Sequence, residues 1–473
     1  MKKEGFVGVI IIALIMLSCT LVLINQPVNN LDELWNYNFS RCIYKGMLPY
    51  KEFSMITMPL SPLFVGVVMH ILGDNLIVYR ICGIILYMLI AIIVYRIFKR
   101  FLKGRCTIAA CFTVMIMQLI LSEYRYDYNY FNLLLILLII LISTSCNYTY
   151  RREAIIGLLS GLTLCVKQTT GVCIIGANII VAYILNRKYQ YDIKKLIIRY
   201  VMSVIPGVMM ALYFVITETV IDFIQYCIYG VTTFNNSISY IQFILSSPFN
   251  MIIGIGFPFI IIYLFYCSIK KEDLNILCYL IYACAGCIVM YPITDNYHFY
   301  IGAVPVLIIF IGVQDFKKST NIQNIICAMF SIGIILISTW MIYPKGDFIK
   351  SKLPVYKGIN ISRSLEDSIL NVDNYIMLCE TNGENVYIVD SGAAAYTIPL
   401  NRYTKDMDML LIGNTGGKGI MEFDINYDNS KFMLNPNIEQ LNWQFDKKWY
   451  ETIVTNYKKT GEECGFDIFK REN

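Results

Sequence analysis

The sequence predicts an all-α polytopic membrane protein with a small α/β domain at its C-terminal end. Hydrophobic residues make up 57% of its 473 residues, and charged residues only 15%, against about 25% in an average soluble protein. Apolar runs longer than 16 residues recur along residues 1–343, close to the ~20 residues that a membrane-spanning helix needs. Residues 344–473 are polar, with strand-like runs and turn signals. This composition excludes a cytosolic enzyme, a secreted disulfide scaffold and a disordered chain.

About eleven apolar runs are expected to form transmembrane helices. They are 5–25, 76–98, 106–122, 130–146, 154–167, 171–186, 199–217, 250–268, 274–292, 299–314 and 323–343. No small-residue cleavage pattern follows the first run, so we expect an uncleaved helix and not a signal peptide. The stretch 59–72 is short and contains two prolines, which is more typical of an interfacial helix than of a span. It would belong to a first outer loop at 26–75.

The loop charges predict the orientation in the membrane. With a cytoplasmic N-terminus, 16 basic residues lie on the cytoplasmic side, whereas the short outer segments carry five. The 16 residues are Lys2, Lys3, Lys99, Arg100, Lys103, Arg105, Arg151, Arg152, Arg187, Lys188, Lys194, Lys195, Lys270, Lys271, Lys317 and Lys318. The positive-inside rule favours this threading, which puts the domain at 344–473 outside the cell. Because the basic clusters follow the topology, we expect a plasma-membrane protein with no nucleic-acid partner.

Polar and ionisable residues gather in four places that this topology puts at the outer membrane interface. After the first, third, fifth and ninth spans these are, in turn, Asp32 and Glu33; Glu123, Arg125 and Asp127; Lys167 with Gln168, Thr169 and Thr170; and Asp295, Asn296, Tyr297 and His298. Gathering ionisable groups at one depth of a membrane is costly, so such a set indicates a functional site. Each group also has a purely structural explanation. Asp32 and Glu33 could be a solvated loop start or a helix N-cap, and Glu123 and Asp127 could pair internally with Arg125. Lys167 could snorkel to the headgroups, and His298 could belong to an interfacial aromatic belt.

In these residues the sequence resembles the GT-C superfamily of polytopic glycosyltransferases, of the protein O-mannosyltransferase and aminoarabinose-transferase type. The first outer loop of that family has an acidic pair, a Gly, a Tyr-acidic-Phe segment and a Pro-rich segment. The matching residues here are Asp32-Glu33, Gly46, Tyr50-Lys51-Glu52-Phe53 and Met58-Pro59-Leu60-Ser61-Pro62. Later motifs match at Glu123 to Asp127, at Gly157 to Lys167 and at Tyr297-His298. Many members have Lys where this chain has Met58, and Lys167 or Lys51 would substitute for it.

The resemblance implies a polyprenyl-phosphate-linked sugar as donor and a glycan, lipid or protein outside the cell as acceptor. It also implies direct displacement with inversion at the sugar. Asp32 would be the general base, with Glu33 as the fallback. Lys167 and His298 would stabilise the leaving phosphate, and the membrane spans would hold the lipid tail. Asp127 would position the acceptor or hold Lys167, and the other candidate binding residues are Glu123, Tyr297 and Lys51.

Two other functions fit the composition: a transporter or flippase of lipid-linked saccharides, and a non-catalytic membrane subunit of an envelope-assembly complex. Transporters tend to have paired halves and charged residues deep within spans, whereas the ionisable groups here are expected at one face. The two histidines exclude a His-rich metal site, but a divalent cation between Asp32 and Asp127 stays open. Most cysteines lie in apolar runs and act as small hydrophobic residues; Cys379 and Cys464 could pair in the outer domain.

Overall fold

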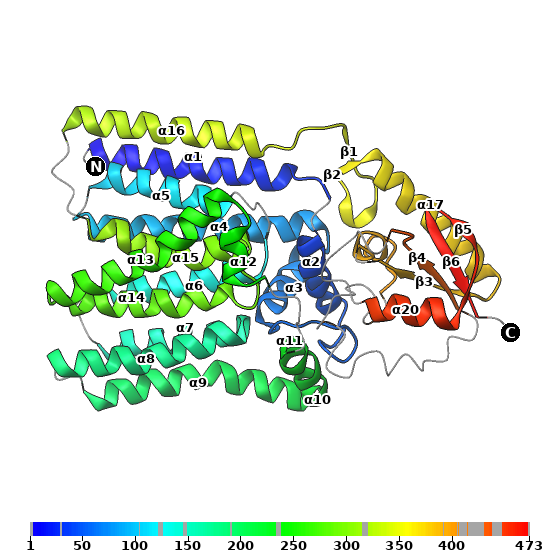
Figure 1. Ribbon diagram of the computed structural model, residues 1–473, viewed down its shortest axis with the longest axis horizontal. Coiled ribbons are helices and arrows are strands. Elements are labelled where there is room, and N and C mark those ends of the chain that lie inside the picture. Colours follow the sequence, from blue (N-terminus) through cyan, green and yellow to red (C-terminus); the bar gives the residue numbers. More distant parts are fainter. Residues whose placement is uncertain are drawn as a thin grey trace. The chain divides into compact units, whose positions relative to one another are not determined.

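The computed structural model describes residues 3–28, 31–103, 105–121, 126–144, 149–189, 192–232, 238–314, 320–390, 392–403, 405, 414, 430–437 and 447–471. The chain divides into two compact units, which are considered one at a time (Figure 1). Unit 1 comprises residues 1–24, 81–212 and 237–343, and unit 2 comprises residues 25–80, 213–236 and 344–473. Composition alone divides the chain at residue 343, whereas unit 2 combines the first predicted outer loop with the C-terminal region.

All eleven apolar runs form helices, and these helices make up most of unit 1. They are α1 (Lys3–Asn25), α4 (Leu76–Phe101), α5 (Cys106–Leu121), α6 (Tyr128–Ser143), α7 (Tyr150–Val166), α8 (Gln168–Tyr189), α9 (Ile193–Ile216), α13 (Pro248–Lys270), α14 (Leu274–Gly286) with the 3₁₀ turn η2 (Cys287–Met290), α15 (Asn296–Gly312) and α16 (Asn321–Ile342). The short α12 (Tyr240–Leu245) lies between α9 and α13 in the chain. In the described ranges, six of the eleven (α1, α4, α8, α9, α13 and α16) are long and apolar enough to cross a membrane. The polytopic helical class is therefore confirmed, and the count of eleven spans stays a prediction.

The outward faces of several unit 1 helices are apolar. Met209 on α9, Phe259 on α13 and Met329 on α16 are each about two-thirds exposed (66%, 65% and 68%). Exposed apolar surface on this scale is unfavourable in water and is ordinary against lipid. The backbones of α7 and α9 approach closely at Gly157, where a Cβ atom would lie 2.1 Å from the carbonyl oxygen of Arg199. Small residues at such crossings are typical of packed membrane helices.

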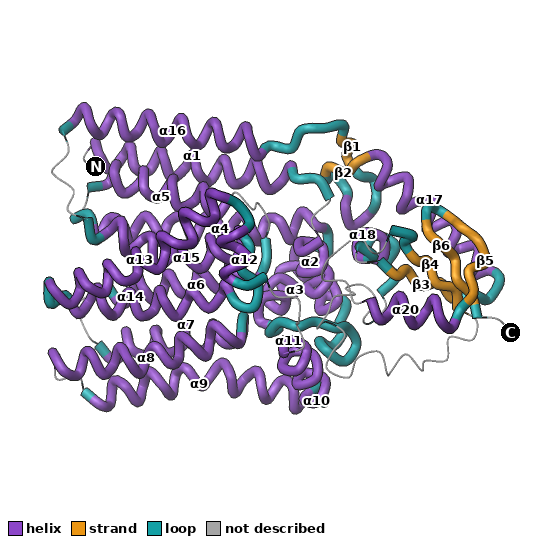
Figure 2. Tube along the Cα trace, viewed as in Figure 1, coloured by secondary structure: helices purple, strands orange, loops and turns teal. Residues whose placement is uncertain are grey.

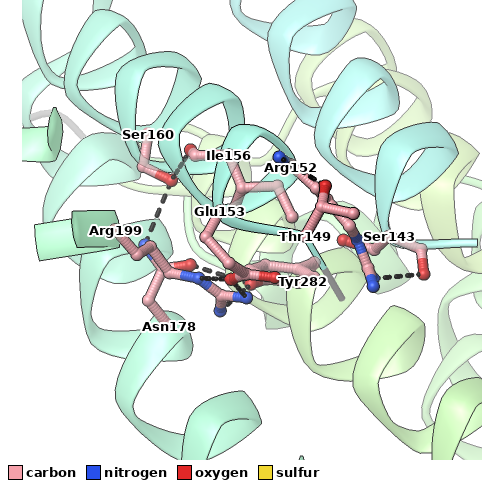
Figure 3. Close-up of polar contacts among 9 residues, drawn as sticks. All are labelled: Ser143, Thr149, Arg152, Glu153, Ile156, Ser160, Asn178, Arg199 and Tyr282. Carbon is pink, nitrogen blue, oxygen red and sulfur yellow. Dashed lines mark hydrogen bonds and ion pairs between the residues drawn. The ribbon is translucent and has the colours of Figure 1, made fainter. Parts of the chain in front are cut away.

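A buried polar network joins four helices of unit 1 (Figure 3). Arg199 of α9 donates through Nε to Glu153 of α7 at 2.7 Å and through Nη1 to the hydroxyl of Tyr282 of α14 at 3.0 Å. Tyr282 donates to Asn178 of α8 at 2.8 Å, and Asn178 donates to Ser160 of α7 at 3.1 Å. The side chains of Glu153 and Arg199 are 0% and 1% exposed. A charge pair this deeply buried stabilises the bundle only while both partners are present.

This network was not expected from the sequence. Arg152 precedes the apolar part of α7, and the loop-charge count places it on the cytoplasmic side. Arg152 is also buried, and its guanidinium donates to the carbonyl of Ser143 at 2.8 Å (Figure 3). Lys167 follows the last residue of α7, so ionisable groups are buried near both ends of this helix and not at one face alone.

Unit 2 contains the helices of the first outer loop and a small α/β fold. The loop forms α2 (Leu31–Tyr44) and α3 (Leu60–Leu72), and α10 (Val220–Phe223), the π-helix η1 (Ile224–Tyr229) and α11 (Gly230–Thr232) follow α9. The C-terminal elements are β1 (Phe348–Lys350), η3 (Pro354–Tyr356), β2 (Asn360–Ser362), α17 (Arg363–Thr381), β3 (Asn385–Val389), α18 (Ala394–Thr397), β4 (Ser430–Leu434), α20 (Lys447–Asn456), β5 (Lys458–Glu463) and β6 (Phe466–Lys470). The 13-residue α3 covers the stretch that its length and prolines indicate to be interfacial.

The main sheet of unit 2 has the strand order β3-β4-β6-β5, and its strands are labelled in Figure 1 and drawn in orange in Figure 2, as are β1 and β2 of the separate two-stranded sheet. β3 and β4 are parallel, and the other two pairings are antiparallel. Alternate side chains of β4 enter two apolar clusters, with Phe432 packed near Ile453 of α20 and Met433 packed near Ile376 of α17. This alternation confirms the predicted α/β region. Cys379 and Cys464 are both free thiols.

The buried pair in unit 1 gives a stability prediction. Glu153→Gln leaves the Arg199 charge without its carboxylate and is expected to lower the free energy of unfolding by about 3–5 kcal/mol. The double variant Glu153→Gln/Arg199→Met removes both charges and is expected to recover most of that loss. Thermal unfolding in detergent measures both changes. Asp192→Asn, which alters an exposed contact with Tyr150, is the control, and a loss for Glu153→Gln no larger than for this control would contradict the prediction.

Candidate functional site

The predicted site residues fall into one group in each unit. Unit 1 contains Asp127, Lys167, Tyr297 and His298, whereas unit 2 contains Asp32, Glu33 and Lys51. Glu123 lies outside the described residues. Each group is built up below from its own unit.

Lys167 occupies the junction between α7 and α8. Its backbone is extended (φ −145°, ψ 111°), and its N–H still donates to the carbonyl of Thr163 at 2.9 Å. The chain can reverse tightly here because Gly171 lies against α7, where a Cβ atom would come within 2.1 Å of Leu164 Cα. The lysine side chain is therefore held inside unit 1, and the residue is only 8% exposed.

The buried ammonium group of Lys167 is held by neutral oxygen atoms. Nζ donates to Asn129 Oδ1 at 3.1 Å and to the carbonyl of Val289 at 3.4 Å. It also lies 5.7 Å from the centre of the Tyr128 ring.

Asp127 and Lys167 are connected through Asn129. Asp127 is the N-cap of α6, and its Oδ1 accepts from the backbone N–H of Asn129 at 2.7 Å. Its Oδ2 accepts from the side-chain amide of Asn129 at 3.3 Å, while the other end of that amide accepts from Lys167. The structure thus brings together the predicted Asp127 and Lys167 through a residue that the sequence analysis did not select.

His298 and Tyr297 begin α15. Asp295 is the N-cap of this helix, and its Oδ1 lies 2.8 Å from both the backbone nitrogen and Nδ1 of His298. This contact orients the imidazole, which is largely buried. The Tyr297 ring packs edge-on against Tyr130 of α6, with centroids 5.6 Å apart. The N-terminal ends of α6 and α15 therefore pack together in unit 1.

A cavity of about 570 Å³ opens beside η2 in unit 1. Most of its lining is apolar; the lining residues are Cys173, Ile238, Ser239, Tyr240, Cys284, Ala285, Cys287, Ile288, Met290, Tyr291, Pro292 and Thr294. Val289, whose carbonyl accepts from Lys167, lies between two of these residues. One short segment of the chain therefore both lines the cavity and contributes the carbonyl group that accepts from Lys167. This arrangement suits a ligand with an apolar part and an anionic part.

The acidic pair of unit 2 lies in the first turn of α2. Carboxylates are favoured there by the helix dipole. Glu33 is 4% exposed and forms a bidentate ion pair with Arg80, with Nε–Oε1 and Nη2–Oε2 distances of 2.8 and 2.7 Å. Arg80 is 1% exposed and also donates to the carbonyls of Gln26 and Pro27, at 2.5 and 3.4 Å. Asp32, the neighbour of Glu33, is half-buried.

Lys51 is the most exposed of the predicted site residues. Its ammonium group lies 3.9 Å from Glu218 Oε2, and its side chain is 45% exposed. Surface pairs of this kind contribute little to stability. Its carbonyl oxygen accepts from Lys405 at 2.9 Å, so its backbone is tied to the C-terminal region of unit 2.

Among the described residues, no three His, Cys, Asp or Glu side chains gather in a way that could hold a metal ion. The convergence of Asp32 with Asp127 and Lys167, with or without a divalent cation, stays a prediction. The residues that the sequence analysis missed are Arg80, Asn129 and the N-cap role of Asp295. An arginine inside an otherwise apolar run, as Arg80 is, is the signal that could have revealed the first of them.

The comparisons with known proteins fit these observations. The family described as dolichyl-phosphate-mannose-protein mannosyltransferase matches residues 57–221. This range includes Arg80, Asp127 and Lys167 and begins after Asp32 and Glu33. A search of curated proteins finds no match.

Two solved structures of ArnT from Cupriavidus metallidurans are similar to this chain over nearly their whole length. The structure bound to undecaprenyl phosphate has a TM-score of 0.63 and 12% identity, and the match covers 99% of this chain and 98% of that one. The apo structure has a TM-score of 0.62 and 11% identity, with 98% and 97% covered. The chain therefore shares the fold of ArnT, which agrees with the GT-C fold that the sequence resemblance implies.

The ion pair of Arg80 gives a prediction for unit 2. Arg80→Met leaves Glu33 buried without its counter-charge and leaves two backbone carbonyls without their donor. The free energy of unfolding is expected to fall by about 3–5 kcal/mol. Arg80→Lys keeps the charge but cannot form the two-pronged contact, so an intermediate loss is expected. Thermal unfolding measures the loss, with Lys51→Met as the exposed control; equal stability of Arg80→Met and this control would refute the role.

Proposed function

We propose that this protein is a membrane glycosyltransferase that uses a polyprenyl-phosphate-linked sugar as donor. The acceptor would be a glycan, lipid or protein on the outer side of the membrane. The observation that carries the proposal is the buried ammonium group of Lys167, held by neutral oxygens, one of which is the carbonyl of Val289 in a segment whose neighbouring residues line a mostly apolar cavity. The ArnT fold, the mannosyltransferase family match and the undecaprenyl phosphate bound to that ArnT support it.

In this proposal the phosphate of the donor lies near Lys167. A cation in a site of low dielectric attracts an anion far more strongly than a cation in water does. The charge on the phosphate grows as the bond to the sugar breaks, so the same ammonium group stabilises the transition state. The apolar cavity would take the first part of the lipid tail. His298, oriented by Asp295, is the second candidate partner of the phosphate.

Asp32 is the proposed general base. The acceptor hydroxyl oxygen forms a bond to the anomeric carbon, and the hydroxyl proton passes to the Asp32 carboxylate. The bond between that carbon and the phosphate oxygen breaks, and the phosphate leaves with the electron pair. Such a direct displacement inverts the anomeric centre. Glu33 is a weaker choice for the base, because its carboxylate already forms two contacts with the buried Arg80.

The proposed orientation places the N-terminus in the cytoplasm and residues 344–473 outside the cell, with the protein in the plasma membrane. The loop charges support this orientation. It matches the chemistry, since a lipid-linked sugar can serve as donor where nucleotide sugars are absent. The alternatives, a transporter of lipid-linked saccharides and a non-catalytic subunit, would bind such a lipid without transferring its sugar.

Removing the proposed base tests the reaction. Asp32→Asn keeps the shape of the side chain but cannot accept the proton at neutral pH, so transfer is expected to fall about 10²–10⁴-fold. Binding of the donor lipid should stay close to that of the unaltered protein. The measurement is sugar transfer from defined polyprenyl-phosphate sugars in liposomes, with the product followed by mass spectrometry.

Asp192→Asn is the matched control, because it makes the same change at a carboxylate whose contact with Tyr150 is exposed. It is expected to retain near-normal transfer. Near-normal transfer by Asp32→Asn would remove the assignment of the base. Lipid binding by the unaltered protein with no transfer to any acceptor would favour the alternatives.

The buried ammonium group of Lys167 gives a prediction for use of the donor. Lys167→Met removes the charge that would face the donor phosphate, so kcat/KM for the donor is expected to fall by about 10²-fold. Lys270→Met, at the exposed end of α13, is the control and should leave kcat/KM near its original value. An unchanged kcat/KM in Lys167→Met would contradict the role of Lys167.

A further inference from the structure

The C-terminal region of unit 2 contacts the first outer loop just before α2. Asn360 of β2 donates through its side-chain amide to the carbonyl of Asn25 at 2.7 Å. The carbonyl of Asn360 accepts from the N–H of Val28 at 2.9 Å. These two bonds fix the backbone that leads into α2, a few residues before Asp32.

The same region contacts the far end of α2 through Arg41. This arginine is 6% exposed, and its Nη1 donates to the carbonyl of Ile398 at 3.0 Å. Its Nη2 donates to Asn401 Oδ1 at 3.3 Å, and Lys45 donates to the same oxygen. Its Nε pairs with Asp74 at 3.0 Å. One buried guanidinium therefore ties α2 to the segment that follows α18.

Further contacts hold the loop after α2. The N–H of Ser54 donates to the hydroxyl of Tyr403 at 3.1 Å, and Asn414 donates to the hydroxyl of Ser54 at 3.2 Å. The Tyr403 ring also lies edge-on to Phe53, with centroids 6.4 Å apart. Residues of the C-terminal region thus contact the first outer loop at three places: before α2, on α2 and after α2.

We infer that the C-terminal region is the clamp that orients α2 and, through it, the Asp32 carboxylate, with Arg41 and Asn401 as positioning residues. The inference rests on the proposed function, in which Asp32 is the base. Asp32 and Arg41 are nine residues apart on α2, which corresponds to about 13 Å along a helix. A tilt of about 5° at the Arg41 end would move Asp32 by roughly 1 Å, and a misplacement of that size can cost about 10²-fold in rate.

Asn401 offers a clean test because its backbone has a φ of +60°. Glycine adopts this conformation without strain, so Asn401→Gly removes the acceptor of Arg41 and Lys45 while leaving the backbone in place. Asn401→Asp keeps an oxygen at that position, and aspartate also tolerates a positive φ. Transfer kinetics and hydrogen exchange of the α2 amides are measured for both variants in the full-length protein.

For Asn401→Gly, kcat is expected to fall roughly tenfold, KM for the donor to stay near its original value, and exchange in α2 to become faster. Asn401→Asp is expected to restore kcat and slow exchange. Arg402→Gln is the control, because Arg402 pairs with Glu380 of α17 and should leave both readouts unchanged. Slow exchange in α2 of Asn401→Gly, or faster exchange with an unchanged kcat, would overturn the clamp.

Asp32→Asn, measured beside these variants, separates the proposed base from the proposed clamp. Retained transfer in Asp32→Asn overturns the proposed base. Faster exchange of α2 together with a lower kcat in Asn401→Gly, both reversed in Asn401→Asp, supports the clamp even where Asp32→Asn retains transfer. A fall in kcat for Asn401→Gly without faster exchange overturns orientation of α2 as its cause.

Discussion

The cost of burying a charge governs the polar architecture of this protein. Five cationic side chains are buried among the described residues, and three of them face carboxylates: Arg41 faces Asp74, Arg80 faces Glu33, and Arg199 faces Glu153. The contacts of the Lys167 ammonium group are two neutral oxygens and one aromatic ring. A cation paired with a carboxylate is already neutralised and serves structure, whereas a cation held by neutral dipoles keeps its field for a ligand. The proposed role of Lys167 depends on this difference.

Most of the helical framework could be predicted from the sequence, because the bilayer sets one simple constraint. A spanning helix needs a long apolar run, and each of the eleven runs is a helix. The stretch at 59–72 was separated from them by its length and its prolines, and α3 is a 13-residue helix. The association of the first outer loop with the C-terminal region could not be predicted. It rests on single polar residues such as Arg41, Asn360 and Asn401, which have no periodic pattern and are far apart in the sequence.

The candidate site was predictable in part for the same reason. Asp127 and Lys167 stand out because charges near apolar runs are rare, and the structure joins them through Asn129. The role of Asn129 could not be predicted, since an asparagine at the start of a helix is common. The pair of Glu153 and Arg199 could not be predicted because the two residues are 46 positions apart and no periodic pattern links them. Their burial depends on the close approach of α7 and α9 at Gly157, which hydropathy does not describe.

Buried arginines fix both ends of α2 in unit 2. Glu33 lies in a two-pronged ion pair with Arg80, and Arg41 is fixed at the other end of the helix by three acceptors, while Asp32 itself is half-buried. A base must be held in place and yet be able to take a proton, and both carboxylate oxygens of Glu33 already accept from Arg80. Under the proposed function the adjacent acidic residues therefore divide these tasks: Glu33 anchors the helix, and Asp32 takes the proton.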